Sequence, residues 1–195
     1  PMVTGVQTCP LPILISQYIW QGIWILRNSI LVGIIIYILI YGALLIFKKR
    51  KVVDIKQIIS EAMLSIYTIS LLKITGIIGM KFYFWDVMNG RYNLSLIPFE
   101  DVSLIMLFLN LLLFVPYGIL LPCVFKNLNI KKVVMIGFFT SLSIEVTQLF
   151  GGRYTEIDDL IINTLGTLVG FIIYSYTAKN IFKVNNTKKE INSVV

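Results

Sequence analysis

Ser29–Phe47, which reads SILVGIIIYILIYGALLIF, decides the fold, and the basic run Lys48-Lys49-Arg50-Lys51 follows it directly. A helix needs roughly 20 apolar residues to cross about 30 Å of hydrocarbon, and this stretch nearly supplies them. Four further stretches meet the same requirement: 58–79, 104–125, 133–150 and 160–178. The sequence therefore predicts an all-α integral membrane bundle of about five transmembrane helices.

Composition favours a bilayer over water as the solvent of this chain. Of its 195 residues, 57% are hydrophobic and only 14% are charged, whereas a soluble domain carries about 25% charged residues. Basic loops facing cytoplasm and anionic lipid explain the formal net charge of +7, so no nucleic-acid partner is predicted. The absence of histidine excludes imidazole ligands and histidine bases.

The N-terminal residues differ from the rest. Residues 3–13, VTGVQTCPLPI, resemble a translated sequencing adapter, so we predict a non-native leader over 1–13. The next apolar run, 14–26, is short for a span, and its Gln and Trp residues suit an interfacial helix. We expect three segments beyond the leader: an interfacial helix, first span and basic loop over 14–57, a four-helix membrane domain over 58–178, and a polar tail over 179–195.

The distribution of basic residues predicts the orientation of the bundle. Under alternating topology, the loops 48–57 and 126–132 and the tail 179–195 share one side, and they hold most of the Lys and Arg. Positive loops face the cytoplasm. The loops 80–103 and 151–159 are therefore predicted to face outward, and the C-terminus to be cytoplasmic.

Polar residues in and beside the last three spans are predicted to gather near the outer end. Ser141, Glu145 and Gln148 are spaced to share one face of their helix. A carboxylate inside a span costs on the order of 2.5–3.5 kcal/mol at the bilayer centre, so Glu145 should find a charge partner. Candidate partners are Arg153 and Lys73. The predicted ligand-binding residues are Asn110, Glu145, Gln148, Arg153, Asp158, Asp159 and Asn163.

These polar residues also allow a structural interpretation, in which they only form hydrogen bonds that hold the helices together. Gly166 and Gly170, one turn apart, are predicted to permit close helix packing. Pro116 lies inside the third predicted span, where the missing backbone donor predicts a kink.

In order, these residues resemble the pattern of the VanZ-like family of bacterial envelope proteins. The resemblance is carried by Asn93, Ile97-Pro98-Phe99, Asn110, Pro116-Tyr117-Gly118, Glu145-x-x-Gln148, Arg153, Asp158-Asp159, Asn163-x-x-Gly166 and Gly170. It implies a multi-pass protein of the bacterial cell membrane. The member that gives the family its name is associated with resistance to teicoplanin-type glycopeptides. The resemblance implies no settled biochemical activity.

Three functions therefore remain open. The first is non-catalytic binding, at an outer-face cleft, of membrane lipid and of a lipid-linked cell-wall precursor or glycopeptide-related ligand. The second is an enzyme acting on a lipid or cell-wall precursor, with Glu145 and Asp159 as acid and base and Arg153 holding an anionic head group. The third is a transporter, which the apolar inner halves of the spans disfavour. No cofactor is expected, although a divalent ion held by Asp158, Asp159 and Glu145 is a further alternative.

Overall fold

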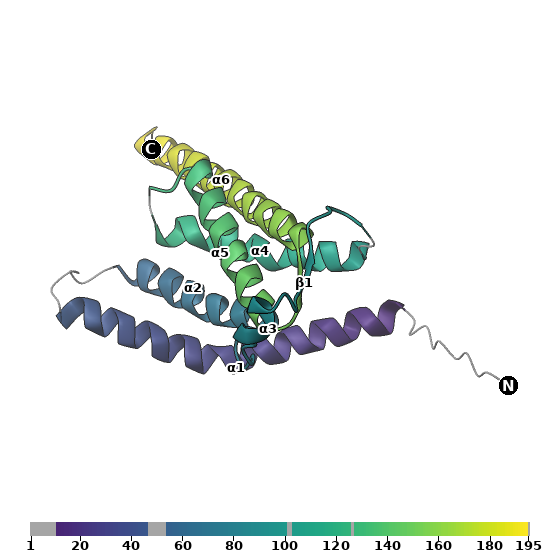
Figure 1. Ribbon diagram of the computed structural model, residues 1–195. Coiled ribbons are helices and arrows are strands. Elements are labelled where there is room, and N and C mark those ends of the chain that lie inside the picture. Colours follow the sequence, from purple (N-terminus) through teal and green to yellow (C-terminus); the bar gives the residue numbers. More distant parts are fainter. Residues whose placement is uncertain (1–10, 47–53, 101–102, 126, 195) are drawn as a thin grey trace.

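The computed structural model describes residues 11–46, 54–100, 103–125 and 127–194. The elements of these residues follow the order α1 (Leu11–Ile46), α2 (Ile55–Ile74), α3 (Phe84–Met88), β1 (Asn93–Ser95), α4 (Leu104–Val124), α5 (Ile130–Phe150), β2 (Tyr154–Glu156) and α6 (Ile157–Val194) (Figure 1). Within them, five helices are long and apolar enough to cross a membrane. The predicted fold class, an all-α bundle of about five membrane-crossing helices, is confirmed.

The first and last helices are longer than the predicted spans. The predicted interfacial segment 14–26 joins the first span in one continuous helix, α1, whose membrane-crossing part is Ile19–Ala43. No proline interrupts the chain between these two segments. At the other end, α6 continues beyond residue 178 through the predicted polar tail. Residues 1–10, most of the predicted leader, and the basic run 48–51 lie outside the described residues.

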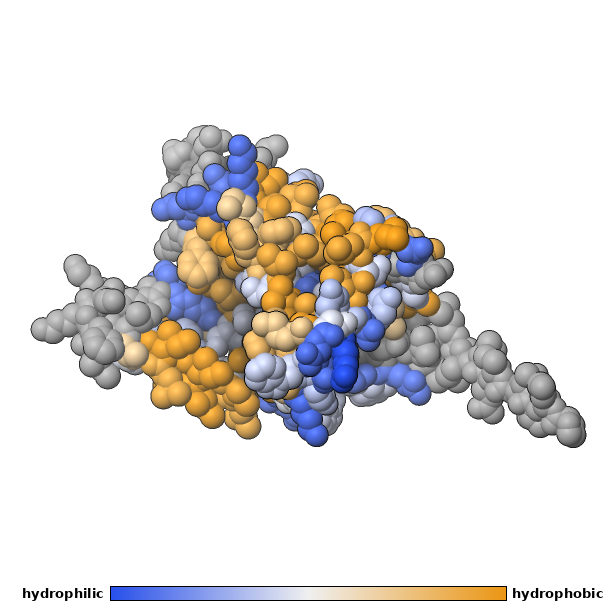
Figure 2. Space-filling view, viewed as in Figure 1, coloured by the Kyte–Doolittle hydropathy of each residue, from blue (hydrophilic) through white to orange (hydrophobic). Residues whose placement is uncertain are grey.

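The buried core lies between α2, α4 and α5, and α4 makes its most extensive contact with α6. The core consists of Leu71, Phe114, Tyr117, Leu121, Val133 and Ile144. Most other apolar side chains face outward: Leu31 is 73% exposed and Leu39 is 65% exposed. Figure 2 shows this broad apolar surface over the helices. Such a surface is the expected complement of lipid chains.

Glycines let α4 and α6 approach until their backbones touch. A Cβ atom on Gly170 would lie 2.1 Å from the carbonyl oxygen of Val115, and one on Gly166 would lie 2.3 Å from that of Leu111. On the facing helix, a Cβ atom on Gly118 would lie 2.1 Å from the carbonyl oxygen of Thr167. The predicted close packing at Gly166 and Gly170 is confirmed.

The two prolines of α4 lie inside a single helix. Pro116 and Pro122 both fall within Leu104–Val124, and the Tyr67 hydroxyl of α2 donates a hydrogen bond to the carbonyl oxygen of Leu113. The kink at Pro116 stays a prediction. The Tyr67 contact ties α2 to the turn of α4 that precedes Pro116.

The candidate site lies at the end of the bundle where several helices begin or end. There α2 ends, α3 lies, α4 begins, α5 ends and α6 begins, and we call it the α3 end (Figure 1). Strands β1 and β2 pair in parallel, with Leu94 opposite Thr155. The backbone N–H of Tyr83 donates to the carbonyl oxygen of Phe150 at 2.7 Å. The α2–α4 connection is thus tied to the turn between α5 and α6.

Candidate functional site

The seven residues predicted as ligand-binding lie on elements that meet at the α3 end. They come from α4 (Asn110), α5 (Glu145 and Gln148), the turn before β2 (Arg153) and α6 (Asp158, Asp159 and Asn163). Among them, four are buried: Glu145, Gln148, Asp158 and Asn163. This placement agrees with the prediction that the polar residues gather at one end of the bundle. Their role in binding a ligand stays a prediction.

Glu145 lies deep in this group, with only 5% of its surface exposed. The Thr155 hydroxyl of β2 donates a hydrogen bond to the backbone carbonyl oxygen of Glu145 at 3.4 Å. Strand β2 therefore folds back onto the last turns of α5. Among the described residues, the Oε2 atom of Glu145 is buried with no hydrogen-bond partner. A buried acceptor without a donor costs about 1–3 kcal/mol.

Arg153 and Gln148 share one acceptor on the neighbouring helix. The Arg153 guanidinium donates from Nη1 to the carbonyl oxygen of Thr75 at 2.6 Å, and the Gln148 amide donates to the same oxygen at 2.7 Å. Thr75 is the C-cap of α2, where carbonyl groups lack helical partners. A Cβ atom on Gly76 would lie 2.2 Å from Nη1 of Arg153, so glycine at this position makes room for the guanidinium.

Asp158 and Asp159 have separate roles despite being neighbours. Asp159 accepts a hydrogen bond from the Asn110 amide of α4. Asp158, 3% exposed, accepts one from the backbone N–H of Phe99 at 2.9 Å. Phe99 has a φ of 62°, an unusual conformation for a bulky residue. Asp158 therefore holds the end of the α2–α4 connection, while Asp159 links two spans.

Asn163 is the deepest of these polar residues along α6. Its amide donates to the Ser141 hydroxyl of α5 at 3.0 Å, and the residue is 4% exposed. The Oδ1 atom of Asn163 is the second buried side-chain acceptor that finds no partner in the described part of the chain. Ser141 and Glu145 are one turn apart on α5, so both orphan acceptors lie between α5 and α6.

The predicted charge partners of Glu145 are wrong as ion pairs. In the part of the chain that the structure describes, neither Arg153 nor Lys73 forms an ion pair with its carboxylate. Arg153 turns toward the end of α2, where its guanidinium donates to the carbonyl oxygen of Thr75. Lys73 faces α1, where its ammonium donates to the carbonyl oxygen of Asn28 at 3.2 Å. In both cases a backbone carbonyl oxygen of a neighbouring helix binds the cation instead.

The alternative of a divalent ion held by Asp158, Asp159 and Glu145 also fails on geometry. The described residues contain no group of three or more carboxylates or thiolates placed to hold a metal ion. Asp158 and Asp159 point to different partners, Phe99 and Asn110. Their oxygens therefore do not converge with those of Glu145.

A polar pocket opens beside these residues at the α3 end. It has a volume of about 370 Å³ and is lined by Ser95, Glu100, Tyr154, Glu156 and Asp158. Thr155, which lies between Tyr154 and Glu156 in β2, donates its hydroxyl to the backbone carbonyl oxygen of Glu145, so this wall of the pocket contacts α5. Strands β1 and β2 contribute Ser95 and Glu156, which are paired residues in the register.

The sequence prediction missed several parts of this site. Thr75 acts through its backbone, and Thr155 and Phe99 act through connections whose pairing depends on β1 and β2. Ser141 was predicted to share a helix face with Glu145 and Gln148, but it was not counted among the ligand-binding residues. The Thr75-Gly76 pair had one as well, because glycine often follows the end of a helix.

Comparisons with known proteins show which family the chain belongs to. The chain is similar to the protein named "Protein VanZ" of Enterococcus faecium, with 27% identity over 127 residues that cover 64% of this chain and 78% of that protein. No solved structure matches significantly. The model of the family described as VanZ/LLP1 matches residues 30–182, a range that holds part of the first span, the whole of the other four and every predicted site residue. Because this match extends over more than half of the chain, the protein belongs to the VanZ/LLP1 family, as a multi-pass membrane protein.

Proposed function

We propose that the α3 end binds the head group of a lipid-linked envelope molecule, such as a cell-wall precursor. The observation that carries this proposal is the pair of buried acceptors without donors, Glu145 Oε2 and Asn163 Oδ1. Native proteins rarely leave such atoms unpaired without a reason. A ligand with hydroxyl, amide or amine hydrogens would supply the missing donors.

Arg153 adds a second requirement on the ligand. Its side chain is exposed, and one of its five N–H donors is spent on Thr75. The remaining donors suit the oxygens of a phosphate, which guanidinium binds in a two-pronged way. Phosphate beside sugar or peptide donors is the chemistry of a lipid-linked cell-wall precursor. Masking such a precursor would lower the access of teicoplanin-type drugs to it, and protection against these drugs is part of the proposal.

The binding site is tested with Glu145→Gln and Arg153→Lys in reconstituted vesicles. The probe is a fluorescent polyprenyl diphosphate that carries a cell-wall disaccharide. Hydrogen bonds to charged groups contribute about 1.5–3 kcal/mol, so we expect each variant to bind the probe about 10- to 100-fold more weakly. Lysine cannot reproduce the planar contact of Arg153. Protection of a susceptible host against a teicoplanin-type drug should fall in parallel.

The matched control is Arg91→Lys. Arg91 lies at the same end, but its side chain is 76% exposed and pairs with Asp86 at 3.5 Å. This variant should bind the probe like the wild type. Unchanged probe binding by both site variants at normal folded yield would contradict a charged site, and the polar residues would then serve only to hold the helices together.

A membrane enzyme on the same precursor is the second candidate. It is favoured by the presence of two carboxyl groups, Glu145 on α5 and Asp159 on α6, on helices that pack against each other. A pair of carboxyl groups in one site is a common acid–base arrangement. Mass spectrometry of the precursor after incubation with the wild type would separate the two functions: a changed mass supports the enzyme, and an unchanged one supports binding alone.

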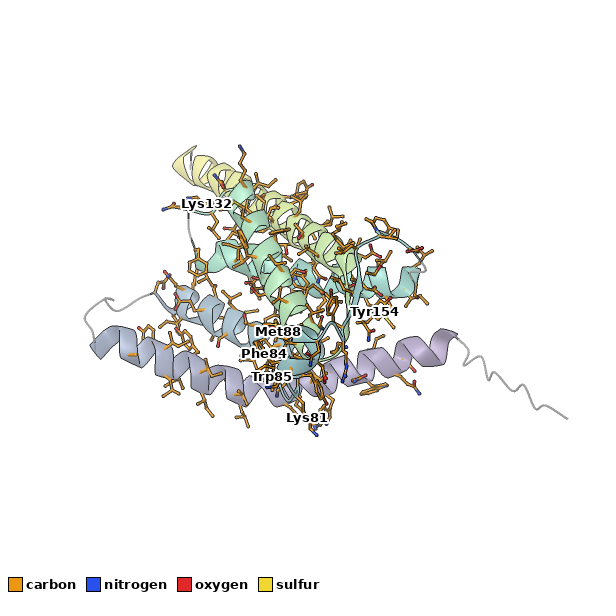
Figure 3. All side chains as sticks on the ribbon, viewed as in Figure 1. Lys81, Phe84, Trp85, Met88, Lys132 and Tyr154 are labelled. Atoms are coloured by element: carbon orange, nitrogen blue, oxygen red, sulfur yellow. The ribbon has the colours of Figure 1, made fainter. Side chains whose placement is uncertain are left out.

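The proposed ligand also requires the α3 end to face outward and the C-terminus to be cytoplasmic. The two cysteines of the chain, Cys9 and Cys123, are first replaced with serine. A cysteine at Tyr154, which is 61% exposed at the α3 end (Figure 3), should then react with an impermeant thiol reagent added to intact cells. A cysteine at exposed Asn127, between α4 and α5, should react only after lysis. The reverse pattern would place the site in the cytoplasm.

A further inference from the structure

The connection between α2 and α4 carries a run of large apolar side chains that the bundle does not cover. Trp85 is 77% exposed, Met88 64% and Phe82 64%, and α3 contains no buried residue. Figure 3 shows Lys81, Phe84, Trp85 and Met88 grouped around α3. A contiguous exposed patch of this kind marks an interaction surface.

This short helix is held in place by the end of α5. A helix of five residues is unstable alone in water. Its N-cap Tyr83 donates a backbone hydrogen bond to Phe150, and the Phe84 ring stacks on the Phe150 ring at a centroid distance of 5.7 Å. Met80 fills the space beside Gly151, where a Cβ atom would lie 1.9 Å from its sulfur. One side of the connection is therefore fixed to α5, and the other faces outward.

The position of α3 along the bundle indicates whether its outer side contacts water or lipid. In Figure 1, the first turns of α4 and the N-terminal part of α1 continue past α3. The side chains of these extensions are themselves apolar and exposed: Leu104 is 81% exposed, Phe108 60% and Ile23 51%. The apolar, exposed surface of α1 and α4 thus reaches beyond α3, so α3 lies within the length of the bundle that lipid would surround.

We propose that residues 81–88 form an interfacial anchor, which we call the α3 anchor, and that its partner is the lipid of the leaflet at the α3 end. Tryptophan and tyrosine are enriched where membrane meets water. In the α3 anchor, Trp85, Met88 and Phe82 enter the boundary between head groups and acyl chains. The exposed Lys81 reaches the lipid phosphates.

The α3 anchor determines the depth of the candidate site. Phe84 stacks on Phe150 at the end of α5, and Arg153 follows three residues later. Lipid contact at α3 therefore places the guanidinium of Arg153 at the level of the head groups. A ligand of the site then enters sideways from the bilayer rather than from bulk water. This last consequence rests on the proposed function, whereas the α3 anchor itself does not.

Tryptophan fluorescence tests the α3 anchor directly. The chain has three tryptophans, so Trp20→Phe with Trp24→Phe leaves Trp85 alone. The protein is reconstituted into phosphatidylcholine vesicles, with or without lipid brominated near the head-group end of its chains. We expect strong quenching of Trp85 by this lipid and weak quenching by aqueous iodide. A reference protein carries Trp85→Phe and Leu39→Trp in addition to the two substitutions above, so its single tryptophan lies in the middle of α1. This tryptophan should be quenched best by lipid brominated near the chain end.

A second readout does not depend on the tryptophan substitutions. In the protein lacking Cys9 and Cys123, a cysteine is introduced by Met88→Cys and labelled with a nitroxide. We expect the nitroxide to collide more often with oxygen, which concentrates in lipid, than with a water-soluble nickel complex. Strong iodide or nickel access with no effect of brominated lipid would overturn the α3 anchor, because the face would then contact water. The α3 anchor would also be overturned if Trp85 were protected from both iodide and brominated lipid, and if this protection disappeared when the protein was diluted in lipid. A second copy of the chain would then be the partner of this surface.

Discussion

Replacing Gly170 with alanine should destabilise the protein clearly, through a clash between the backbones of α4 and α6. The new Cβ atom would lie 2.1 Å from the carbonyl oxygen of Val115 and 2.9 Å from Cα of Gly118. Both are backbone atoms, so no side chain can rotate away and α4 must separate from α6. Overpacking of this kind costs about 1–3 kcal/mol, and we expect the upper end of that range. The midpoint of thermal unfolding in detergent and the folded yield should both fall clearly.

The control is the same substitution at Gly42. A Cβ atom there meets nothing within 4 Å, and alanine is favoured over glycine in a helix by about 1 kcal/mol. Gly42→Ala should therefore unfold at the wild-type temperature or slightly above it. Equal unfolding temperatures for Gly170→Ala and Gly42→Ala would contradict the backbone contact between α4 and α6.

Replacing Glu145 with methionine should abolish function while leaving the protein at least as stable as the wild type. The carboxylate is 5% exposed, and its Oε2 atom has no partner among the described residues. Methionine has a similar length and removes the cost of burying that oxygen. Replacing buried charged groups with apolar ones of similar volume is often neutral or stabilising by about 1–4 kcal/mol.

Binding of the fluorescent precursor and thermal unfolding would be measured on the same preparation. We expect precursor binding to fall about 100-fold or more, since the variant can neither accept a hydrogen bond nor carry a charge at this position. Val146→Met is the control, because Val146 is the next residue of α5 and is 46% exposed. A large loss of stability in Glu145→Met would show instead that the carboxylate holds the bundle together, and normal precursor binding would remove Glu145 from the site.

Most of the membrane architecture could be predicted because it depends on local sequence. Each span needs only enough consecutive apolar residues. The third predicted span, 104–125, therefore begins at the first residue of α4 and ends one residue after its last. Helical spacing likewise placed Glu145 and Gln148 on one face of α5, where both are buried. The small side chain of Gly170 predicted close packing without any knowledge of the partner helix.

The partners of the polar residues could not be predicted in the same way. Arg153 and Gln148 meet the carbonyl oxygen of Thr75, which lies more than 70 residues earlier in the chain. Every residue has a backbone carbonyl, so residue type carries no signal for such an acceptor. Opposite charge suggested Lys73 and Arg153 as partners of Glu145. The packing of α2 against α1 and the turn after α5 direct both cations elsewhere.

The sequence alone determined that this chain crosses the membrane, which residues form its helices and which polar residues gather at one end. These properties follow from apolar length and helical period, which act over about 20 residues or fewer. Only the tertiary structure decided how that end is built: Asn110 pairs with Asp159, Asp158 holds Phe99, and α3 rests on Phe150. These contacts join segments far apart in the chain. Their geometry depends on how closely α4, α5 and α6 pack, and that distance is set by all three helices together rather than by any one stretch of residues.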